Sequence, residues 1–475
     1  MDGLPSPHRV PRNPRKGVLY RVLQATLPLF LETFEADSER ILPGFVRSEL
    51  EGYLGCGTPE GGFSRYRCDC CGLEELIPFS CKGRGFCPSC GGRRMSSQAA
   101  HLVDHVLPRV PIRQWVFTLP WELRALLAYN PDVLEGVKRI WWDSIAWWLN
   151  LQAKKQGLEE VHLGGVNMVQ RFDSALRLNV HFHTLVLSGV YSLTPAGELV
   201  FHELPCPSKD DLALILHRIT FKVVDWLVAH DHLTEDGNGV EGSPESLPGM
   251  LLAKAVTGGS AMGGKVGLQG RDPFAEVTFT LVNHAAACQG FTLYVGPSLG
   301  PEGTYRVEKI CRYIARPPIA APRLHLTPKG DVVYKFKRPW KDGTHSVCLT
   351  QLAFVERLAA LVPPPRRHLL TYHGVLAPNA ALRARVVPAK PESLSTTDSK
   401  PETPSSKSQP TSQEEEKPSA YYPWAYLLNR VFGIKPWICP RCGGPRRLIS
   451  QITDPLVVIK ILDHHSGKDP PVLPA

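Results

Sequence analysis

The chain has 475 residues, which is too long for one ordinary hydrophobic core, so we expect about three domains. Lys and Arg exceed Asp and Glu by nine, a moderate excess that allows a polyanionic partner without requiring one. The N-terminal residues lack the apolar core of a secretory signal, and no apolar run reaches the roughly 18 residues of a membrane span. Of the thirteen cysteines, seven lie between residues 56 and 90, which favours metal binding over disulfides and excludes a secreted disulfide scaffold. We therefore expect a cytoplasmic protein that has no contact with membranes.

Apolar periodicity and punctuation divide the chain into five parts. The predicted parts are an N-terminal helical segment (1–50), a zinc-binding DNA-contact domain (51–100), a catalytic domain (101–385), a disordered linker (386–420) and a separate small module (421–475). Within the third part we expect strands over 114–119, 165–172 and up to 187, helices over 131–154, 208–231 and 351–361, a short helix before Pro317, and a β-hairpin over 323–337. The glycine-rich stretch 244–270 reads as a surface loop, and the tryptophans at 141, 142, 147 and 148 as a buried helix face.

Two histidines flank one apolar residue in the strand that ends at residue 187. Successive side chains on a strand point to opposite faces, so His181 and His183 share a face while Phe182 points into the core. Neutral imidazole is the commonest nitrogen ligand for divalent ions, and the pair is therefore half of a metal site. Gln170 on the preceding strand is our choice for the third ligand, because a hairpin brings it beside the histidines. Asp173 carries charge, but we expect it in the turn.

Two Cys-x-x-Cys knuckles, each followed by glycine, predict zinc in the cysteine-rich segment. Fifteen residues separate Cys68 and Cys71 from Cys87 and Cys90, a spacing that suits one closed, structural four-thiolate site. Arginines accompany the knuckles and predict phosphate contacts, with Arg93 and Arg94 as the chosen residues.

The remaining cysteines leave several alternatives open. Cys56, Cys70 and Cys81 are surplus: Cys81 could replace one ligand, or Cys56 and Cys81 could add a second site. The tail holds one further knuckle, Cys439 and Cys442, for which His464 and His465 are candidate partners; a tail with no metal fits equally well.

A tyrosine with cations on its own helical face precedes Pro317. If the segment is a helix, Arg306, Lys309 and Arg316 lie on the face of Tyr313. Neighbouring positive charge favours the phenolate, and the same cations would hold a phosphodiester. Together with a metal held by the histidines, this pattern favours covalent catalysis through a phosphotyrosine, with Tyr305 as the alternative nucleophile.

The segment Gly259–Lys265 matches only the beginning of a phosphate-binding loop. Val266 stands where the magnesium-binding Ser or Thr is needed, and glycines at 267 and 270 break the helix that should follow. We therefore predict that the protein uses no nucleotide cofactor.

The order of these motifs resembles the rolling-circle insertion-sequence transposases of the IS-ninety-one family, which are HUH (His-hydrophobic-His) endonucleases. The resemblance rests on the zinc knuckles, the His-Phe-His strand, and the stretches Ser80–Cys90, Tyr313–Pro318 and Tyr372–Asn379. It implies an α+β fold: an HUH core of antiparallel sheet flanked by helices, with an N-terminal zinc-knuckle domain and a small C-terminal module.

The resemblance also implies an activity: cleavage and joining of single-stranded DNA at element ends through a 5′-phosphotyrosine, with magnesium or manganese. Tyr313 would be the nucleophile and His181 and His183 the metal ligands, with host replication machinery as a further partner. Lys309 and Pro317 occupy the positions four residues from Tyr313, so the chain looks like a single-tyrosine variant. A second strand would then need a second subunit or the reuse of Tyr313.

Two other functions compete with this interpretation. A plasmid replication initiator or relaxase shares the chemistry, but the N-terminal knuckles and the Ala-Arg-Pro-Pro context favour a transposase. A non-catalytic zinc-knuckle DNA-binding regulator would leave Tyr313 and the paired histidines unexplained.

Overall fold

A computed structural model describes residues 14–36, 42–79, 83–232, 280–282, 284–288, 290–340, 342–388, 422, 424–433 and 435–466. Most of the expected linker 386–420, the glycine-rich stretch 244–270 and Cys81 therefore lie outside the described residues.

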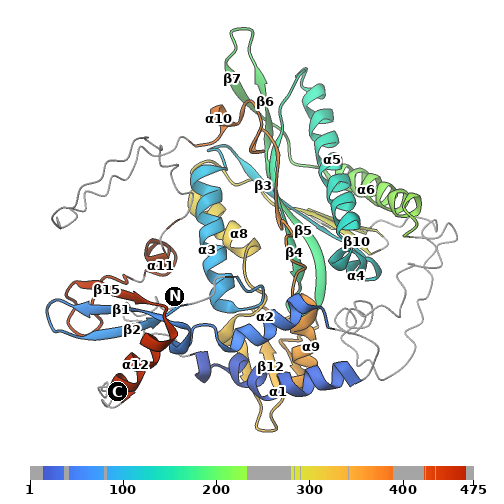
Figure 1. The fold of residues 1–475 in the computed structure, drawn as a ribbon. Coiled ribbons are helices and arrows are strands. Elements are labelled where there is room, and N and C mark those ends of the chain that lie inside the picture. Colours follow the sequence, from blue (N-terminus) through green and yellow to red (C-terminus); the bar gives the residue numbers. More distant parts are fainter. Residues whose placement is uncertain are drawn as a thin grey trace, which may run out of the picture.

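A seven-stranded sheet, antiparallel at every pairing, forms the centre of the molecule (Figure 1). Its strands follow the order β14 (Leu370–Gly374), β4 (Gly164–Phe172), β5 (Leu178–Leu187), β3 (Ile112–Thr118), β10 (Phe291–Val295), β9 (Ala285–Cys288) and β8 (Thr280–Val282). Apolar residues occupy both faces of β4 and β5, because helices cover both sides of the sheet.

Helices from different parts of the chain cover the two faces of the sheet (Figure 1). One face carries α4 (Trp121–Tyr129), α5 (Pro131–Lys155) and α6 (Lys209–Ala229), and the other carries α3 (Pro88–His105) and α8 (Thr304–Ile314). The predicted tryptophan face of α5 is partly confirmed: Trp141 is fully buried, stacks on Phe117 and donates to Thr184 Oγ1 at 2.8 Å. Trp148 is buried as well, whereas Trp142 and Trp147 are only partly buried.

A smaller helical layer lies at one end of the sheet. It contains α1 (Val18–Ala36), α2 (Gly44–Leu54) and α9 (Gln351–Leu361), beside the small sheet β11 (Leu324–Leu326), β12 (Val332–Lys335) and β13 (Ser346–Leu349). Thr26 on α1 donates to the Gln351 side chain at 2.9 Å, which joins the N-terminal helix to a segment more than 300 residues away. The predicted hairpin at 323–337 is thus two strands of a three-stranded sheet.

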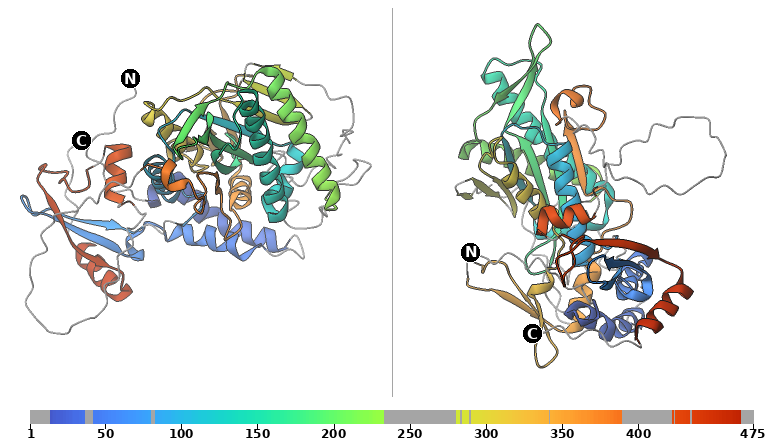
Figure 2. Two further views of the ribbon diagram at one scale, coloured as in Figure 1. Left: turned by 90° about the horizontal axis from the view of Figure 1, so that it is seen from above. Right: turned by 90° about the vertical axis from the view of Figure 1, so that its left-hand side faces the viewer.

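The C-terminal segment is not a separate module, contrary to the sequence-based expectation. Strand β15 (Arg446–Ile452) pairs with β1 (Phe63–Cys68), which pairs in turn with β2 (Glu74–Pro78). Figure 2 shows the blue strands of the cysteine-rich segment beside the red C-terminal strand, with α12 (Pro455–Ser466) next to them. Phe63, Ile452 and Val458 form their common core, so each part buries apolar surface that neither could bury alone.

The other elements are short or lie outside these layers: η1 (Pro14–Lys16), η2 (Pro59–Gly61), β6 (Gly189–Leu193), β7 (Leu199–Glu203), η3 (Ala321–Arg323), α10 (Arg383–Val386) and α11 (Trp424–Phe432). None of the described helices combines the length and the apolar character needed to cross a membrane.

Candidate active site and zinc centres

Strand β5 presents both histidines to the sheet face that α8 covers. The ring centroids of His181 and His183 lie 4.8 Å apart, while Phe182 points to the opposite face and is fully buried. The predicted alternation is therefore confirmed, and it follows from the pleat of the strand.

A hydrogen bond to the backbone fixes the tautomer of His181 that can bind a metal through Nε2. Its Nδ1 lies 2.8 Å from the carbonyl oxygen of Asn179, so Nδ1–H donates and the Nε2 lone pair remains for a cation. Burial lowers the pKa of His181 to about 4, with further lowering by Arg316 and Arg124 against the Asn179 hydrogen bond. The imidazole is thus neutral at neutral pH, as metal binding requires.

His183 has one ring nitrogen engaged and one left over. Its Nδ1 lies 2.9 Å from the side-chain amide of Gln114, and a half-turn of that amide would let Gln114 match either tautomer. Its Nε2 is buried and has no hydrogen-bond partner among the described residues. Burial, and then the neighbouring His181, lower the pKa of His183 well below its usual value. A buried nitrogen without a partner is costly, and a bound cation would remove that cost.

Gln170 lies beside the pair, at the position expected for a third ligand. It stands opposite His181 in the β4–β5 register and is buried. Its amide nitrogen donates to the Ile314 carbonyl at 2.9 Å, which leaves the Oε1 oxygen as the atom that could bind a metal. The same bond fixes the end of α8 against the sheet.

Asp173 lies in the turn after β4, as expected. Its Oδ1 accepts from the backbone N–H groups of Ala175 and Arg177, and its Oδ2 accepts from Arg177 Nε at 2.6 Å. Both oxygens of the Asp173 carboxylate therefore accept hydrogen bonds within the turn.

Tyr313 on α8 faces the histidines. Its ring centroid lies 6.1 Å from that of His183 at an interplanar angle of 84°, and 43% of the residue is exposed. Tyr305 lies in the first turn of the same helix, about 12 Å farther along its axis, and is 71% exposed. Of the two tyrosines, the helix brings Tyr313 to the histidine pair.

The three predicted cations have different positions. The Arg316 guanidinium lies over the Tyr313 ring, 4.2 Å from its centroid, and also approaches Phe172. Arg306 and Lys309 are exposed on α8. Of the three predicted cations, Arg316 therefore contacts the Tyr313 ring, whereas the side chains of Arg306 and Lys309 are exposed to solvent.

The cysteines form two groups, and neither is the predicted set. Cys68 and Cys71 meet Cys439 and Cys442, whereas Cys87 and Cys90 meet Cys56; within each group the sulfur atoms lie within 4.8 Å of one another. The expected single site of Cys68, Cys71, Cys87 and Cys90 is thus corrected to two groups. Pairing of β1 with β15 places the tail knuckle on the first knuckle, and so Cys68 and Cys71 complete the tail pair.

The second group lies at the start of α3. Cys87 is the N-cap residue, Cys90 lies in the first turn, and Cys56 follows α2. Gly91 in the same turn packs against Pro317: a Cβ added to Gly91 would lie 2.4 Å from the Pro317 Cβ. This close approach links the second group to the Ala-Arg-Pro-Pro segment that follows Tyr313.

Several basic side chains of this region serve the fold. Arg65 pairs with Glu74, Arg84 donates to the Ser48 and Glu49 carbonyls, and Arg94 donates to the Gly83 and Arg84 carbonyls. Arg93 is partly buried on α3. The positive charge that suggested DNA contact is therefore partly engaged within the molecule.

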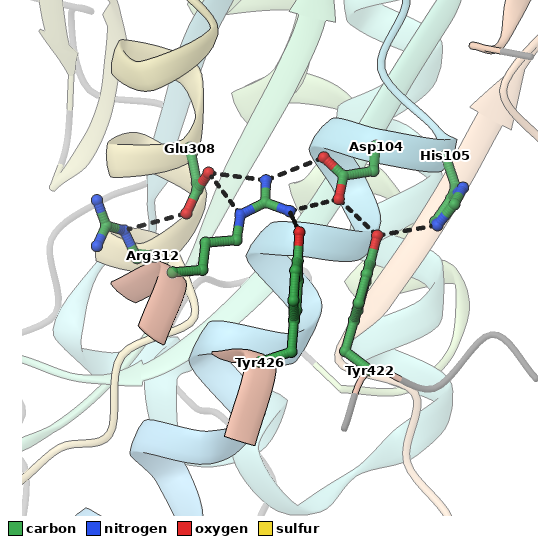
Figure 3. A network of polar contacts seen from close by, with 7 residues as sticks. Asp104, His105, Glu308, Arg312, Tyr422 and Tyr426 are labelled. Carbon is green, nitrogen blue, oxygen red and sulfur yellow. Dashed lines mark hydrogen bonds and ion pairs between the residues drawn. The ribbon is translucent and has the colours of Figure 1, made fainter. Parts of the chain in front are cut away.

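A polar network that the sequence reading missed joins the tail to the helix of Tyr313 (Figure 3). Arg430 on α11 donates to Asp104 on α3 and to Glu308 on α8, both at 2.9 Å. Tyr422 donates to Asp104 at 2.5 Å and lies 2.9 Å from His105 Nε2. Burial alone would raise the pKa of Asp104, but the bonds from Arg430 and Tyr422 and the charge of Arg430 lower it. No local motif marks these residues, because three distant segments supply them.

Two family models match the chain. A model described as "Putative transposase" matches residues 164–383, which include the histidine strand and Tyr313, and a model described as "Transposase zinc-binding domain" matches residues 28–119. The chain is also 24% identical, over 332 residues, to the transposase for insertion sequence element IS801 of Pseudomonas savastanoi pv. phaseolicola, covering 68% of each chain. No solved structure matches the chain. Both family models and this relative agree with the motif order and together support a transposase of the IS-ninety-one family.

Proposed function

We propose that this transposase cleaves and rejoins single-stranded DNA at the ends of its element, with Tyr313 as the nucleophile. The observation that carries the proposal is the distance of 6.1 Å between the ring centroids of Tyr313 and His183, on the sheet face where the His181 imidazole also lies. In this proposal the antiparallel sheet with helices on both faces is an HUH endonuclease core.

The proposed step exchanges one phosphodiester for another. The Tyr313 oxygen attacks phosphorus, the bond from phosphorus to the 3′ oxygen breaks, and the 5′ phosphate becomes linked to the tyrosine. The phenol proton leaves to solvent, to which the half-exposed Tyr313 has access, and the departing 3′ oxygen takes up a proton. Attack by a 3′ hydroxyl on the phosphotyrosine reverses these changes and joins the strands, so no energy source is consumed.

A divalent cation, magnesium or manganese, would be held by His181, His183 and Gln170. The unpartnered Nε2 of buried His183 and the bond from His181 Nδ1 to Asn179 support this donor set. Such a cation would polarise the phosphoryl oxygens and so favour attack at phosphorus. Gln170 has a further role, since its amide nitrogen holds the Ile314 carbonyl next to Tyr313.

The cations around the tyrosine hold the DNA. Arg316 covers the Tyr313 ring and is placed to meet the charge of the attacked phosphate, while exposed Arg306 and Lys309 extend the positive surface along α8. Arg93 and Arg94 contribute DNA contacts from the zinc-binding domain. Arg94 also donates hydrogen bonds to the Gly83 and Arg84 carbonyls. These contacts read phosphates, so they provide affinity more than sequence specificity.

The direct test incubates the full chain with labelled single-stranded element ends plus magnesium or manganese. We expect a covalent protein–DNA adduct that peptide mapping assigns to Tyr313, and no adduct with Tyr313→Phe, which removes only the hydroxyl. Tyr305→Phe is the matched control on the same helix and should form the adduct normally. A nucleotide mapped to Tyr305 or to any other residue would contradict the proposal.

A further inference from the structure

The tail knuckle and the first knuckle face each other with the geometry of one metal centre. Cys68 Sγ lies 3.5 Å from Cys442 Sγ, and Cys71 Sγ lies 3.7 Å from Cys439 Sγ. Zinc–sulfur bonds of about 2.3 Å in a tetrahedron place neighbouring sulfurs about 3.8 Å apart, whereas a disulfide requires about 2.05 Å. The spacing therefore fits a shared tetrahedral ion and not a pair of disulfides.

The backbones of the two knuckles have the same turn. Gly72 N–H donates to the Cys68 carbonyl at 3.1 Å, and Gly443 N–H donates to the Cys439 carbonyl at 3.0 Å. Both glycines have positive φ, 67° and 71°, which side chains rarely tolerate. Each knuckle thus turns both of its sulfurs to one side, as a ligand pair must.

The surroundings of the four sulfurs join the two ends of the chain. Cys68 stands opposite Arg446 in the β1–β15 register, and Asp69 N–H donates to the Pro445 carbonyl at 3.1 Å. Arg447 pairs with Asp69 at 3.0 Å, and Arg446 pairs with Glu75. Oppositely charged side chains from the two ends of the chain therefore pair beside the four sulfurs.

We propose that Cys68, Cys71, Cys439 and Cys442 bind one structural zinc ion, which makes the C-terminal segment a component of the zinc-binding domain. The matched zinc-domain model ends at residue 119, so two of the four ligands lie outside it. Four thiolates close the coordination shell, so the ion takes no part in catalysis. Helix α11 lies just before the tail knuckle, and Arg430 on it bridges α3 and α8. The zinc ion thereby fixes a segment that contacts the helix of Tyr313.

Zinc content of the purified full chain tests the ligand set. Measured by elemental analysis, the double variant Cys439→Ser, Cys442→Ser should contain about one zinc fewer per chain than the wild type. Cys206→Ser with Cys348→Ser, two cysteines outside both groups, should leave the content unchanged. Cys70→Ser is the sharper control, because Cys70 lies inside the first knuckle but is not in the group. Unchanged zinc in the Cys439 and Cys442 double variant, or an equal loss in Cys70→Ser, would overturn the proposal.

Thiol alkylation of the wild-type chain gives a second test that needs no variant. Cys442 is exposed, as are Cys70 and Cys348, so burial alone would leave all three reactive. We expect Cys442 to resist iodoacetamide until a chelator is added, while Cys70 and Cys348 react at once. Equal labelling of Cys442 and Cys348 before chelation, or a disulfide found between the two knuckles, would refute the shared zinc site. Neither test depends on DNA cleavage, so the proposed function can fail without affecting it.

Discussion

The histidine face and the group of Cys68, Cys71, Cys439 and Cys442 are two chemical centres assembled in opposite ways. His181 and His183 are two residues apart on one strand, and their partner Gln170 comes from the adjacent strand of the same hairpin. Cys68 and Cys71, in contrast, meet cysteines from near the other end of the chain. A centre built from one hairpin can be read from local alternation, whereas a centre built from distant segments depends on which segments pair.

The largest expected effect separates the two centres by function. His181→Ala with His183→Ala should lower single-strand cleavage by about 1000-fold or more, because both imidazole ligands of the proposed cation are lost. DNA binding and zinc content should remain close to those of the wild type. A nicking assay with magnesium or manganese, run beside DNA-binding and elemental measurements, checks this. Full cleavage in excess chelator would contradict the metal assignment.

Cys87→Ser should break the second cysteine group while leaving the first intact. We expect loss of metal from the Cys56, Cys87 and Cys90 group and a lower free energy of unfolding, by about 3 kcal/mol or more, since metal binding and folding are coupled in such sites. Thermal unfolding and thiol mapping together provide the measurement. If Cys439 became reactive as readily as Cys56, the two groups would not be independent.

Arg430→Met should weaken the contact between the tail and the helix of Tyr313. Asp104 and Glu308 would lose the cation between them, which we expect to cost about 2–3 kcal/mol of unfolding free energy. Because the folded pKa of Asp104 is lowered, its contribution is full above the ordinary carboxyl value of about 3.9 and is lost as pH falls through the folded pKa. The variant should therefore differ less from the wild type below that pH; a pH-independent difference would argue against the ion pairs.

Gly91→Ala tests the link between the second cysteine group and the segment after Tyr313. The added methyl group would collide with Pro317, so we expect a cost of about 1–2 kcal/mol and slower cleavage with zinc retained. Gly92→Ala is the matched control, because its Cβ meets nothing within 4 Å. Equal behaviour of the two variants would remove the proposed link.

The smallest effect concerns the surface pair of Asp69 and Arg447. Both side chains are about half exposed or more, so Asp69→Asn should change the unfolding free energy by less than about 0.5 kcal/mol. Zinc content should stay the same, because the sulfurs and not this pair hold the knuckles. A loss of zinc in Asp69→Asn would show that the ion pair is needed for docking.

The sequence predicted the histidine face better than the grouping of the cysteines, for a physical reason. The side-chain period of a strand puts His181 and His183 on one face whatever lies around them, and the Gln170–His181 register follows from a short connection. The sequence also favoured Tyr313 over Tyr305, because the predicted helix before Pro317 places cations on the face of Tyr313. The contact of Gln114 with His183 was missed, although the sequence predicted the strand over 114–119 that contains Gln114.

The knuckles show where a local pattern becomes ambiguous. All three have the same Cys-x-x-Cys form, and nothing within them says which pair meets which. The nearest pair in sequence was the natural choice, but β15 pairs with β1 and so brings Cys439 and Cys442 to Cys68 and Cys71. Cys87 and Cys90, at the start of α3, are left with Cys56.

The sequence by itself determined the strand with its histidines, the short helix of Tyr313 and the zinc-binding character of the knuckles, since each depends on residues close in the chain. Tertiary structure alone decided the division of the cysteines into two groups, the contact of Gly91 with Pro317, and the bridge of Arg430 between α3 and α8. These arrangements depend on which distant segments bury apolar surface against one another. A local sequence pattern carries no information about which segments those are.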